Sequence, residues 1–384
     1  MRARDYFPLG IAIGYAFCNR TEETELLVNN IKNGKHTLLI ATRRYGKSSL
    51  ALRAIKLSKQ PCVEMDFYMA SSEKVIESYI LNGVVDLIGK TLGSIEKLTA
   101  SIKQYVKNLK PKLNIGTENI KLELTTEANS DPATNVKEGL LLLEQLLEEK
   151  KKHAVLLMDE FQSVGAIAQG KGIEAAIRHV AQKTKYLTII FSGSNRKLLK
   201  SMFDDVNRPL YKLCWKIALT RISADHYKKH LQQAANEFWK KDLSGDALNQ
   251  IISLSERHPF YLNKLCDRLW TYYEKKPPNI AEVKSTWTDI LKEEKSDAVK
   301  EISLLSVGQK NVALLIAKNE TEQLTSKQSI LELQMTSSSI MTALEGLEEK
   351  DFIEKEDNQY QIINPVVKYY VLSGGKHQIE TIQY

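Results

Sequence analysis

Residues 41–54 read ATRRYGKSSLALRA. The stretch matches the phosphate-binding template G-x-x-x-x-G-K-[ST] at Gly46, Lys47 and Ser48. It departs from the template at the first position, which is Ala41. An apolar strand pattern precedes it and apolar residues recur at helical spacing after it, so backbone N–H groups and a helix N-terminus would converge on an anion. We predict a phosphate-binding loop in which the methyl group of Ala41 is tolerated, because that turn keeps a negative φ.

Each position of this loop has a chemical reason. Lys47 would neutralise the β and γ phosphates of a nucleotide, and the Ser48 hydroxyl would ligate Mg²⁺. Gly46 would keep a Cβ away from the point where backbone approaches phosphate. The predicted cofactors are therefore ATP or ADP and Mg²⁺. The candidate nucleotide-binding residues of the loop are Ala41, Arg43, Arg44, Tyr45, Gly46, Lys47, Ser48 and Ser49.

Four further segments read as short buried strands separated by helical patterns. Continuously apolar strands that alternate with helices indicate a parallel sheet covered on both faces. Two alternating runs within residues 110–134 predict a small hairpin inserted into this α/β core. The first predicted strand covers residues 37–40, and the other four cover residues 61–67, 153–161, 186–194 and 214–219.

An acidic pair follows the third strand. Asp159 and Glu160 come directly after four apolar residues, and the carboxyl end of a parallel strand faces the crevice where such sheets bind ligands. We predict that Asp159 holds the Mg²⁺ shell and that Glu160 polarises the attacking water. For Asp159 alone, the alternative is an acidic helix cap.

The fourth strand ends in FSGSN, residues 191–195. A polar residue at this place would contact the γ phosphate or the attacking water. Ser192, Ser194 and Asn195 are the candidates, and Ser194 is favoured as a catalytic residue. The alternative for each is a Ser- and Gly-rich turn into a helix.

Composition shifts after the fifth strand. Helical patterns over residues 222–295 predict a helical lid. Three helical patterns and two short strands over residues 296–384 follow the order of a winged helix-turn-helix. The predicted organisation is an α/β P-loop NTPase core of the AAA+-like class at 1–221, the lid at 222–295 and the winged helix at 296–384.

The charge of the last segment bears on its partner. Residues 300–384 hold 8 Lys, no Arg and 12 acidic residues, a net charge of −4, whereas the whole chain carries +7. The expected recognition helix at 336–350 offers a single Lys, and Lys and Arg supply most of the affinity for nucleic-acid backbone. We expect a protein-contact or autoinhibitory role for the winged helix, with DNA contact through Arg196, Lys197 and Lys200 as the alternative.

Cysteine spacing and hydropathy suggest a cytoplasmic location. The four cysteines are far apart and form no CxxC pair, which is typical of reduced thiols. Residues 1–18 have a basic start and a short apolar run, but Asp5 and Pro8 interrupt it, so we expect no secretory signal. No run reaches the length of about 18 apolar residues that spans a membrane, so we expect no transmembrane helix.

Several short motifs together resemble one family. The chain is similar to the P-loop ATPases found mainly in archaea and also in bacteria, a branch of the AAA+/STAND group related to origin-recognition ATPases. By this resemblance Arg20 lies in a lead-in that packs near the adenine, and His258 with Pro259 lies at a lid helix facing the nucleotide. The motifs that carry it are FCNRTEETELL at 17–27, TRRYGKSSL at 42–50, LLMDEFQSV at 156–164, FSGSNRKLLKSMF at 191–203, RPLY at 208–211, HPFYL at 258–262 and NPVVKYYV at 364–371.

The chain departs from the family pattern at two places. The family usually has Gly before His-Pro, where Arg257 stands here. It usually has Gly-Arg after P-L-Y, where this chain has Lys212 and Leu213, so an arginine finger is missing from that position. Possible substitutes are Arg196, Arg208, Arg221 and Lys212, and the alternative for each is an ordinary surface charge.

The leading functional hypothesis is an ATP-binding switch. It would couple Mg-ATP binding and slow hydrolysis to a core and lid rearrangement and to the control of a partner protein. One alternative is a DNA-associated AAA+-type ATPase, such as a loader or a transposition or defence component. Another is a scaffold that binds nucleotide without hydrolysing it. The sequence leaves the partner and the oligomeric state open.

Overall fold

A computed structural model of the chain describes residues 2–92, 131–167, 171–318, 324–356 and 358–374. The hairpin predicted at 110–134 lies outside these residues, except for its end, where a helix already begins at Pro132. Within the described part of the chain, no helix combines the length and the apolar character needed to cross a membrane.

The chain forms two compact units. The sheet unit comprises Arg20–Arg43 and Lys47–Leu219. The helical unit comprises Met1–Asn19, Arg44–Gly46 and Thr220–Tyr384. The predicted phosphate-binding loop is therefore divided in sequence, because Arg44–Gly46 are assigned to the helical unit while the preceding strand and the following helix belong to the sheet unit. The finer division at 1–221, 222–295 and 296–384 stays a prediction.

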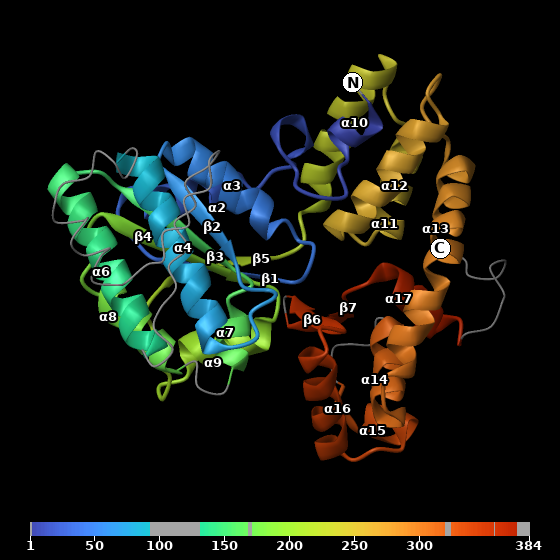
Figure 1. Cartoon of the computed structure of the whole chain (residues 1–384). Helices are drawn as coiled ribbons and strands as arrows, with labels where there is room; N and C mark the ends of the chain where they lie inside the picture. The colour runs from blue at the N-terminus through green and yellow to red at the C-terminus, as the bar shows by residue number, and fades with distance from the viewer. Residues whose placement is uncertain (1, 93–130, 168–170, 319–323, 357, 375–384) are drawn as a thin grey trace. The chain divides into compact units, whose positions relative to one another are not determined.

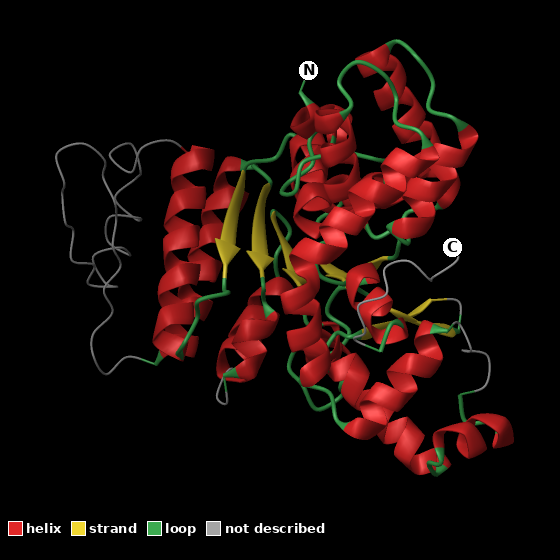
Figure 2. Cartoon of the chain, turned by 90° about the vertical axis from the view of Figure 1, so that its right-hand side faces the viewer, coloured by secondary structure: helices red, strands yellow, loops and turns green. Residues whose placement is uncertain are grey.

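The sheet unit is built on a five-stranded parallel sheet with the strand order β2-β3-β4-β1-β5 (Figures 1 and 2). Every residue of β1 and β4 is buried, which shows that both faces of the sheet are covered. All five strands predicted from sequence are confirmed. They are β1 (Thr37–Ala41), β2 (Cys62–Asp66), β3 (Ala154–Asp159), β4 (Leu187–Gly193) and β5 (Trp215–Leu219).

Helices cover this sheet. α4, α6 and α8 pack side by side, as Figure 1 shows. The start of α6 follows from local chemistry, since the Asp131 carboxylate accepts the Thr134 amide at 2.9 Å and Pro132 takes the first helical position. The helices are α2 (Thr21–Lys32), α3 (Lys47–Ser58), α4 (Glu73–Leu92), α6 (Pro132–Lys150), α7 (Gln162–Ala166), α8 (Lys171–Ala181) and α9 (Arg196–Asp204).

The strand order determines where a site forms. β4 lies between β1 and β3, with Leu39 opposite Ser192 and Met158 opposite Phe191. Because all strands are parallel, their carboxyl ends meet at one edge of the sheet. The carboxyl ends of β1, β3 and β4 therefore lie next to one another.

The helical unit has one continuous apolar core. Trp270 is fully buried in it and packs against Phe7 at 4.7 Å and Trp239 at 4.3 Å between ring centroids. The N-terminal residues thus pack with this unit. Its first elements are α1 (Ala3–Tyr6), the 3₁₀ helix η1 (Gly14–Ala16), α10 (Ala224–Trp239), α11 (Gly245–Leu254), α12 (Pro259–Tyr272) and α13 (Ile280–Ser303).

The end of the helical unit has the predicted winged-helix order. Three helices precede an antiparallel strand pair in which Ile353 lies opposite Ile362. The first helix begins with a capping box between Ser306 and Gln309. The elements are α14 (Val307–Ala317), α15 (Lys327–Leu333), α16 (Ser337–Glu349), β6 (Ile353–Glu356), β7 (Gln359–Ile362) and α17 (Pro365–Leu372).

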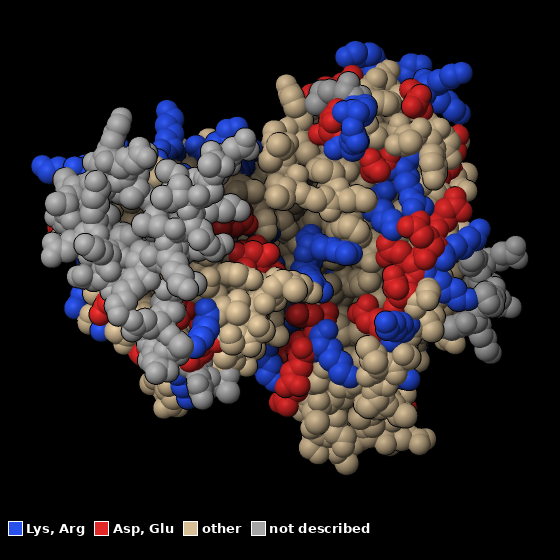
Figure 3. All heavy atoms as spheres, viewed as in Figure 1, with Lys and Arg blue, Asp and Glu red and all other residues tan. Residues whose placement is uncertain are grey.

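Opposite charges line the contact between α12 and α13, where Figure 3 shows basic and acidic side chains interleaved. Lys264 pairs with Glu293 at 3.1 Å and also with Glu294, and Arg268 pairs with Glu293. These carboxylates are used within the unit, so they support packing of the two helices.

Candidate active site

The predicted phosphate-binding loop connects the end of β1 to the start of α3. Gly46 has φ +87°, a left-handed conformation that favours glycine, and a Cβ there would meet no protein atom within 4 Å. Backbone conformation therefore accounts for this glycine in the protein itself. Arg44 also has a positive φ, of 63°. Such alternation of backbone conformation turns successive N–H groups toward a common point, as an anion site requires.

Ala41 ends β1 as a buried strand residue. Its carbonyl accepts a hydrogen bond from Lys47 Nζ at 3.4 Å. The lysine side chain, 7 % exposed, therefore folds back over the loop. Arg43 is exposed and Ser49 is buried on α3. The methyl group at Ala41 fits because this residue is part of the strand and not of the left-handed turn.

Oxygen donors gather at the end of β3. Ser48 Oγ donates to Asp159 Oδ2 at 3.4 Å, and Ser192 Oγ donates to Asp159 Oδ1 at 2.7 Å. A hydroxyl beside a carboxylate suits Mg²⁺, which prefers hard oxygen ligands. Among the described residues no group of three or more His, Cys, Asp and Glu is placed to hold a metal ion. The pair Ser48 and Asp159 therefore fits an ion whose other ligands are phosphate oxygens and water.

Glu160 has a strained backbone and a held side chain. Its φ is +50°, uncommon for a residue with a Cβ. Its Oε2 accepts a hydrogen bond from Ser194 Oγ at 2.9 Å and another from Gln162 Nε2. Ser194, the favoured catalytic candidate at the end of the fourth strand, thus contacts the predicted base. The third candidate, Asn195, has a structural task, since its side chain caps α9 by accepting the Leu198 amide at 2.9 Å.

Sequence reasoning did not single out Gln162 and Gly193. A Cβ on Gly193 would lie 1.9 Å from Gln162 Oε1, so glycine leaves the space in which this amide reaches Glu160. Gln162 Oε1 is buried without a hydrogen-bond partner among the described residues. The feature of the sequence that could have identified Gln162 is its position in the DEFQ segment, directly after the acidic pair.

Arg20 immediately precedes α2, as its N-cap residue, with φ +60°, and is 6 % exposed. Its Nη1 pairs with Glu23 Oε1 at 2.8 Å, and its carbonyl accepts the Thr24 hydroxyl at 2.5 Å. The residue is thus fixed at a helix start in the sheet unit, and its predicted place near an adenine stays a prediction.

Two of the proposed substitutes for an arginine finger have buried partners. Arg208 pairs with Glu174, which is fully buried. Arg221 is 4 % exposed and lies in the helical unit. These two are therefore not ordinary surface charges. Lys212 lies 5.2 Å from the centroid of the Tyr211 ring, and Arg196 is the first residue of α9.

His258 lies at the start of α12, and Pro259 takes the first helical position. The imidazole is 3 % exposed, packs edge-on to the Tyr45 ring at 5.0 Å, and its Nδ1 has no hydrogen-bond partner among the described residues. Burial and the charges of Arg221 and Arg44 lower the pKa of His258 to about 3. His258 is therefore neutral at physiological pH, and its Nδ1 makes no hydrogen bond to the described residues.

Loop residue Arg44 lies in the same unit, with its guanidinium carbon 4.0 Å from the centroid of the Phe260 ring. It lines a pocket of about 460 Å³ together with residues of α12 and α13. Just before His258, Glu256 and Arg257 have φ of 48° and 60°. The left-handed conformation at Arg257 is one that glycine adopts without strain.

The pKa of His258 gives a testable dependence of stability on pH. Between about pH 6.5 and pH 3 the unfolded chain binds a proton that the folded chain does not, so the free energy of unfolding falls as pH decreases through this range. His258→Asn is expected to reduce this slope between pH 6 and 5 by about 1.4 kcal/mol per pH unit. Urea unfolding at several pH values measures it, and an unchanged slope would contradict the burial argument. Burial also lowers the pKa values of His36 and His230, so these two residues contribute a slope of the same sign.

Comparisons with known proteins agree with this fold. A family model described as "Probable winged helix domain" matches residues 300–373. The Walker-type ATPase paby2304 of Pyrococcus abyssi superimposes with a TM-score of 0.64 at 20% identity, covering 93% of this chain and 96% of that one. The ORC2 protein of Aeropyrum pernix, solved as ADPNP-ADP complexes, gives 0.55 at 12% identity, covering 97% and 98%. No curated protein matches the sequence. The chain therefore has the fold of the archaeal Walker-type ATPases, with a winged helix domain at its C-terminal end.

Proposed function

We propose that this chain binds Mg-ATP and hydrolyses it slowly. The observation that carries the proposal is the convergence of the phosphate-loop residue Ser48, the carboxylates of Asp159 and Glu160, and the Ser194 hydroxyl at the carboxyl edge of one parallel sheet. Ser48 and Asp159 would hold Mg²⁺, which when bound supplies positive charge to the phosphate oxygens. Lys47 would add a second positive charge on those oxygens.

Two carboxylates and the residues that hold them would have separate roles in hydrolysis. Glu160 would accept a proton from the attacking water, and Ser194 and Gln162 would hold its carboxylate in place. Asp159 is held by Ser192 and by the Glu160 amide at 3.0 Å. Arg208 and Arg221 already pair with buried carboxylates, so neither would compensate transition-state charge, which supports slow turnover.

We further propose that nucleotide binding controls a partner protein. Residues Arg44–Gly46 of the phosphate-binding loop belong to the unit that holds His258 and the winged helix domain. A nucleotide bound by the loop would therefore bias the lid and winged helix, as a switch requires. The face seen in Figure 3 is largely uncharged over α15 and the lower part of α16, and Glu345 and Glu349 on α16 are exposed. This surface suits a protein more than DNA.

The test is a titration of the full chain with ATP by calorimetry, with and without Mg²⁺, combined with an assay of phosphate release. Binding that tightens with Mg²⁺ and phosphate release well below one turnover per second support the proposal. A chain that binds neither ATP nor ADP would refute it. Hydrolysis that rises with added duplex DNA and falls with salt would favour the DNA-associated alternative, and binding with no phosphate release would favour the nucleotide-bound scaffold.

Gly193→Ala probes how Glu160 is positioned. The new Cβ displaces the Gln162 amide, so we expect turnover to fall on the order of 10-fold to 100-fold while ATP affinity is unchanged. The obstructing atom ends a flexible side chain, so the loss of stability should stay near 1 kcal/mol. Steady-state phosphate release and urea unfolding measure the two effects. Unchanged turnover would show that Gln162 has no part in positioning Glu160.

A further inference from the structure

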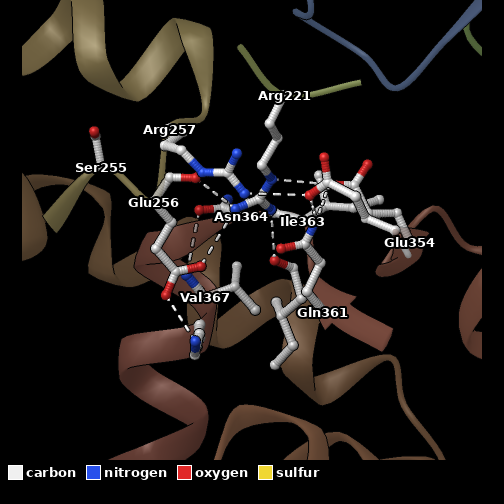
Figure 4. A network of polar contacts seen from close by, with 12 residues as sticks. Arg221, Ser255, Glu256, Arg257, Glu354, Gln361, Ile363, Asn364 and Val367 are labelled. Carbon is white, nitrogen blue, oxygen red and sulfur yellow. Dashed lines mark hydrogen bonds and ion pairs between the residues drawn. The ribbon is translucent and has the colours of Figure 1, made fainter. Parts of the chain in front are cut away.

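Arg221 is the centre of a buried polar network in the helical unit (Figure 4). Its Nη2 donates to the carbonyls of Ile362 and Ile363 at 3.0 and 3.1 Å, where the wing hairpin β6-β7 ends. Its Nη1 donates to the Glu256 carbonyl at 2.7 Å, in the turn before His258. One guanidinium thus joins the wing hairpin to the turn that begins α12.

The remaining nitrogen of Arg221 reaches the phosphate-binding loop. Nε donates to Glu354 Oε1 at 2.9 Å and to Tyr45 Oη at 3.0 Å. Tyr45 Oη in turn donates to Glu354 Oε1 at 2.6 Å, so the three side chains form a closed triangle. Tyr45 is the residue immediately before Gly46.

This triangle is strongly held. Tyr45, Arg221 and Glu354 are 2 %, 4 % and 7 % exposed. Hydrogen bonds to ionised partners in such surroundings are stronger than neutral ones, and removing one partner leaves a buried charge uncompensated. Burial and the Glu354 charge, opposed by Arg221, raise the pKa of Tyr45, so its hydroxyl stays a donor. Gln361 steadies the carboxylate by donating to Glu354 Oε1 at 3.1 Å.

We propose that Tyr45, Arg221 and Glu354 form a latch through which the wing hairpin sets the rate of nucleotide release. This rests on the proposed function, because it assumes that the loop around Tyr45 holds phosphate. With the latch closed, the backbone of the loop is pre-organised for an anion and bound nucleotide leaves slowly. A protein partner that binds the wing hairpin and withdraws Glu354 frees Tyr45, loosens the loop and speeds release. By linkage, bound nucleotide weakens the binding of that partner.

The test measures dissociation of a fluorescent ADP analogue from the full chain. Tyr45→Phe removes one hydroxyl and keeps the ring against His258, and we expect release roughly 10-fold faster. Glu354→Gln, which also weakens the Arg221 contact, should accelerate release at least as much. The double variant should be no faster than the faster single variant, because both changes open the same latch.

Two matched controls separate the latch from a general loss of stability. Tyr370→Phe removes a buried hydroxyl that donates to the Leu291 carbonyl at 2.8 Å, in the same unit but away from the loop. Lys355→Gln removes an exposed charge of the same hairpin, whose ammonium lies 5.3 Å from the centroid of the Tyr360 ring. Both should release ADP at the wild-type rate.

The outcomes distinguish failure of the latch proposal from failure of the proposed ATPase function. If the wild-type chain binds the analogue and Lys47→Ala does not, but Tyr45→Phe releases it at the wild-type rate, the latch is overturned and the ATPase proposal stands. If Tyr370→Phe accelerates release as much as Tyr45→Phe, the effect is general destabilisation and the latch is overturned. If the wild-type chain does not bind the analogue, both proposals fail.

Discussion

Lys47→Ala is expected to weaken ATP binding by at least about 100-fold, which in practice abolishes it at ordinary concentrations. Lys47 is the charged side chain that the phosphate-loop pattern assigns to the phosphates, and its buried ammonium rests on the Ala41 carbonyl. A charge-assisted contact to phosphate in a site shielded from water is worth several kcal/mol, and each 1.4 kcal/mol changes affinity about tenfold. Calorimetric titration with Mg-ATP measures the loss.

Lys56→Ala is the matched control for this variant. Lys56 lies on the same helix α3, is exposed, and its replacement removes the same charge from the chain. It should bind Mg-ATP as the wild-type chain does. Circular dichroism should show that both variants remain folded. If Lys47→Ala binds Mg-ATP with wild-type affinity, the loop around Lys47 does not bind the phosphates and the proposed function is wrong.

The core of the fold could be predicted because its information is local. Each strand is a short apolar run bounded by polar residues, and Asp159 and Glu160 follow directly on such a run. Parallel strands bring their carboxyl ends to one edge, and in the structure Ser194 and Glu160 meet there. The capped helices of the winged helix, such as α14 after Ser306, follow from the same local rules.

Contacts between residues far apart in the chain could not be predicted. Tyr45 and Glu354 are separated by 309 positions, and neither belongs to a pattern that identifies the other. Arg221 looked like a candidate surface charge, because a sequence does not show that one guanidinium will meet three carbonyls and a carboxylate in the same place. Packing of Phe7 on Trp270 was hidden for the same reason.

Backbone strain was also invisible in the sequence. Glu160 and Arg257 have left-handed backbones without being glycine. Each such residue costs on the order of 1–3 kcal/mol, and it persists only where surrounding contacts hold it. Glu160 is held by Ser194 and Gln162, and Arg257 pairs with Glu356. Strain at Glu160 coincides with the residue that the chemistry singles out as the base.

Glu160→Gln is expected to retain Mg-ATP binding and to lower turnover by about 10²-fold to 10⁴-fold. An amide has nearly the shape of the carboxylate and still accepts the Ser194 hydroxyl, so the site keeps its geometry. An amide cannot accept a proton from water, so the step that needs a base is lost. The variant should therefore accumulate bound ATP where the wild-type chain holds ADP.

Single-turnover phosphate release is the decisive measurement, because it reports the chemical step separately from product release. Glu138→Gln is the matched control, since Glu138 is an exposed carboxylate on α6 and the substitution is chemically the same. If Glu160→Gln hydrolyses ATP at the wild-type rate in a single turnover, Glu160 is not the base. If instead the variant loses ATP binding, Glu160 contributes to the binding of Mg-ATP. Retained binding together with lost chemistry is the result expected of a base at this position, because Ser194 and Gln162 keep their places around the amide while the group that accepts a proton is gone.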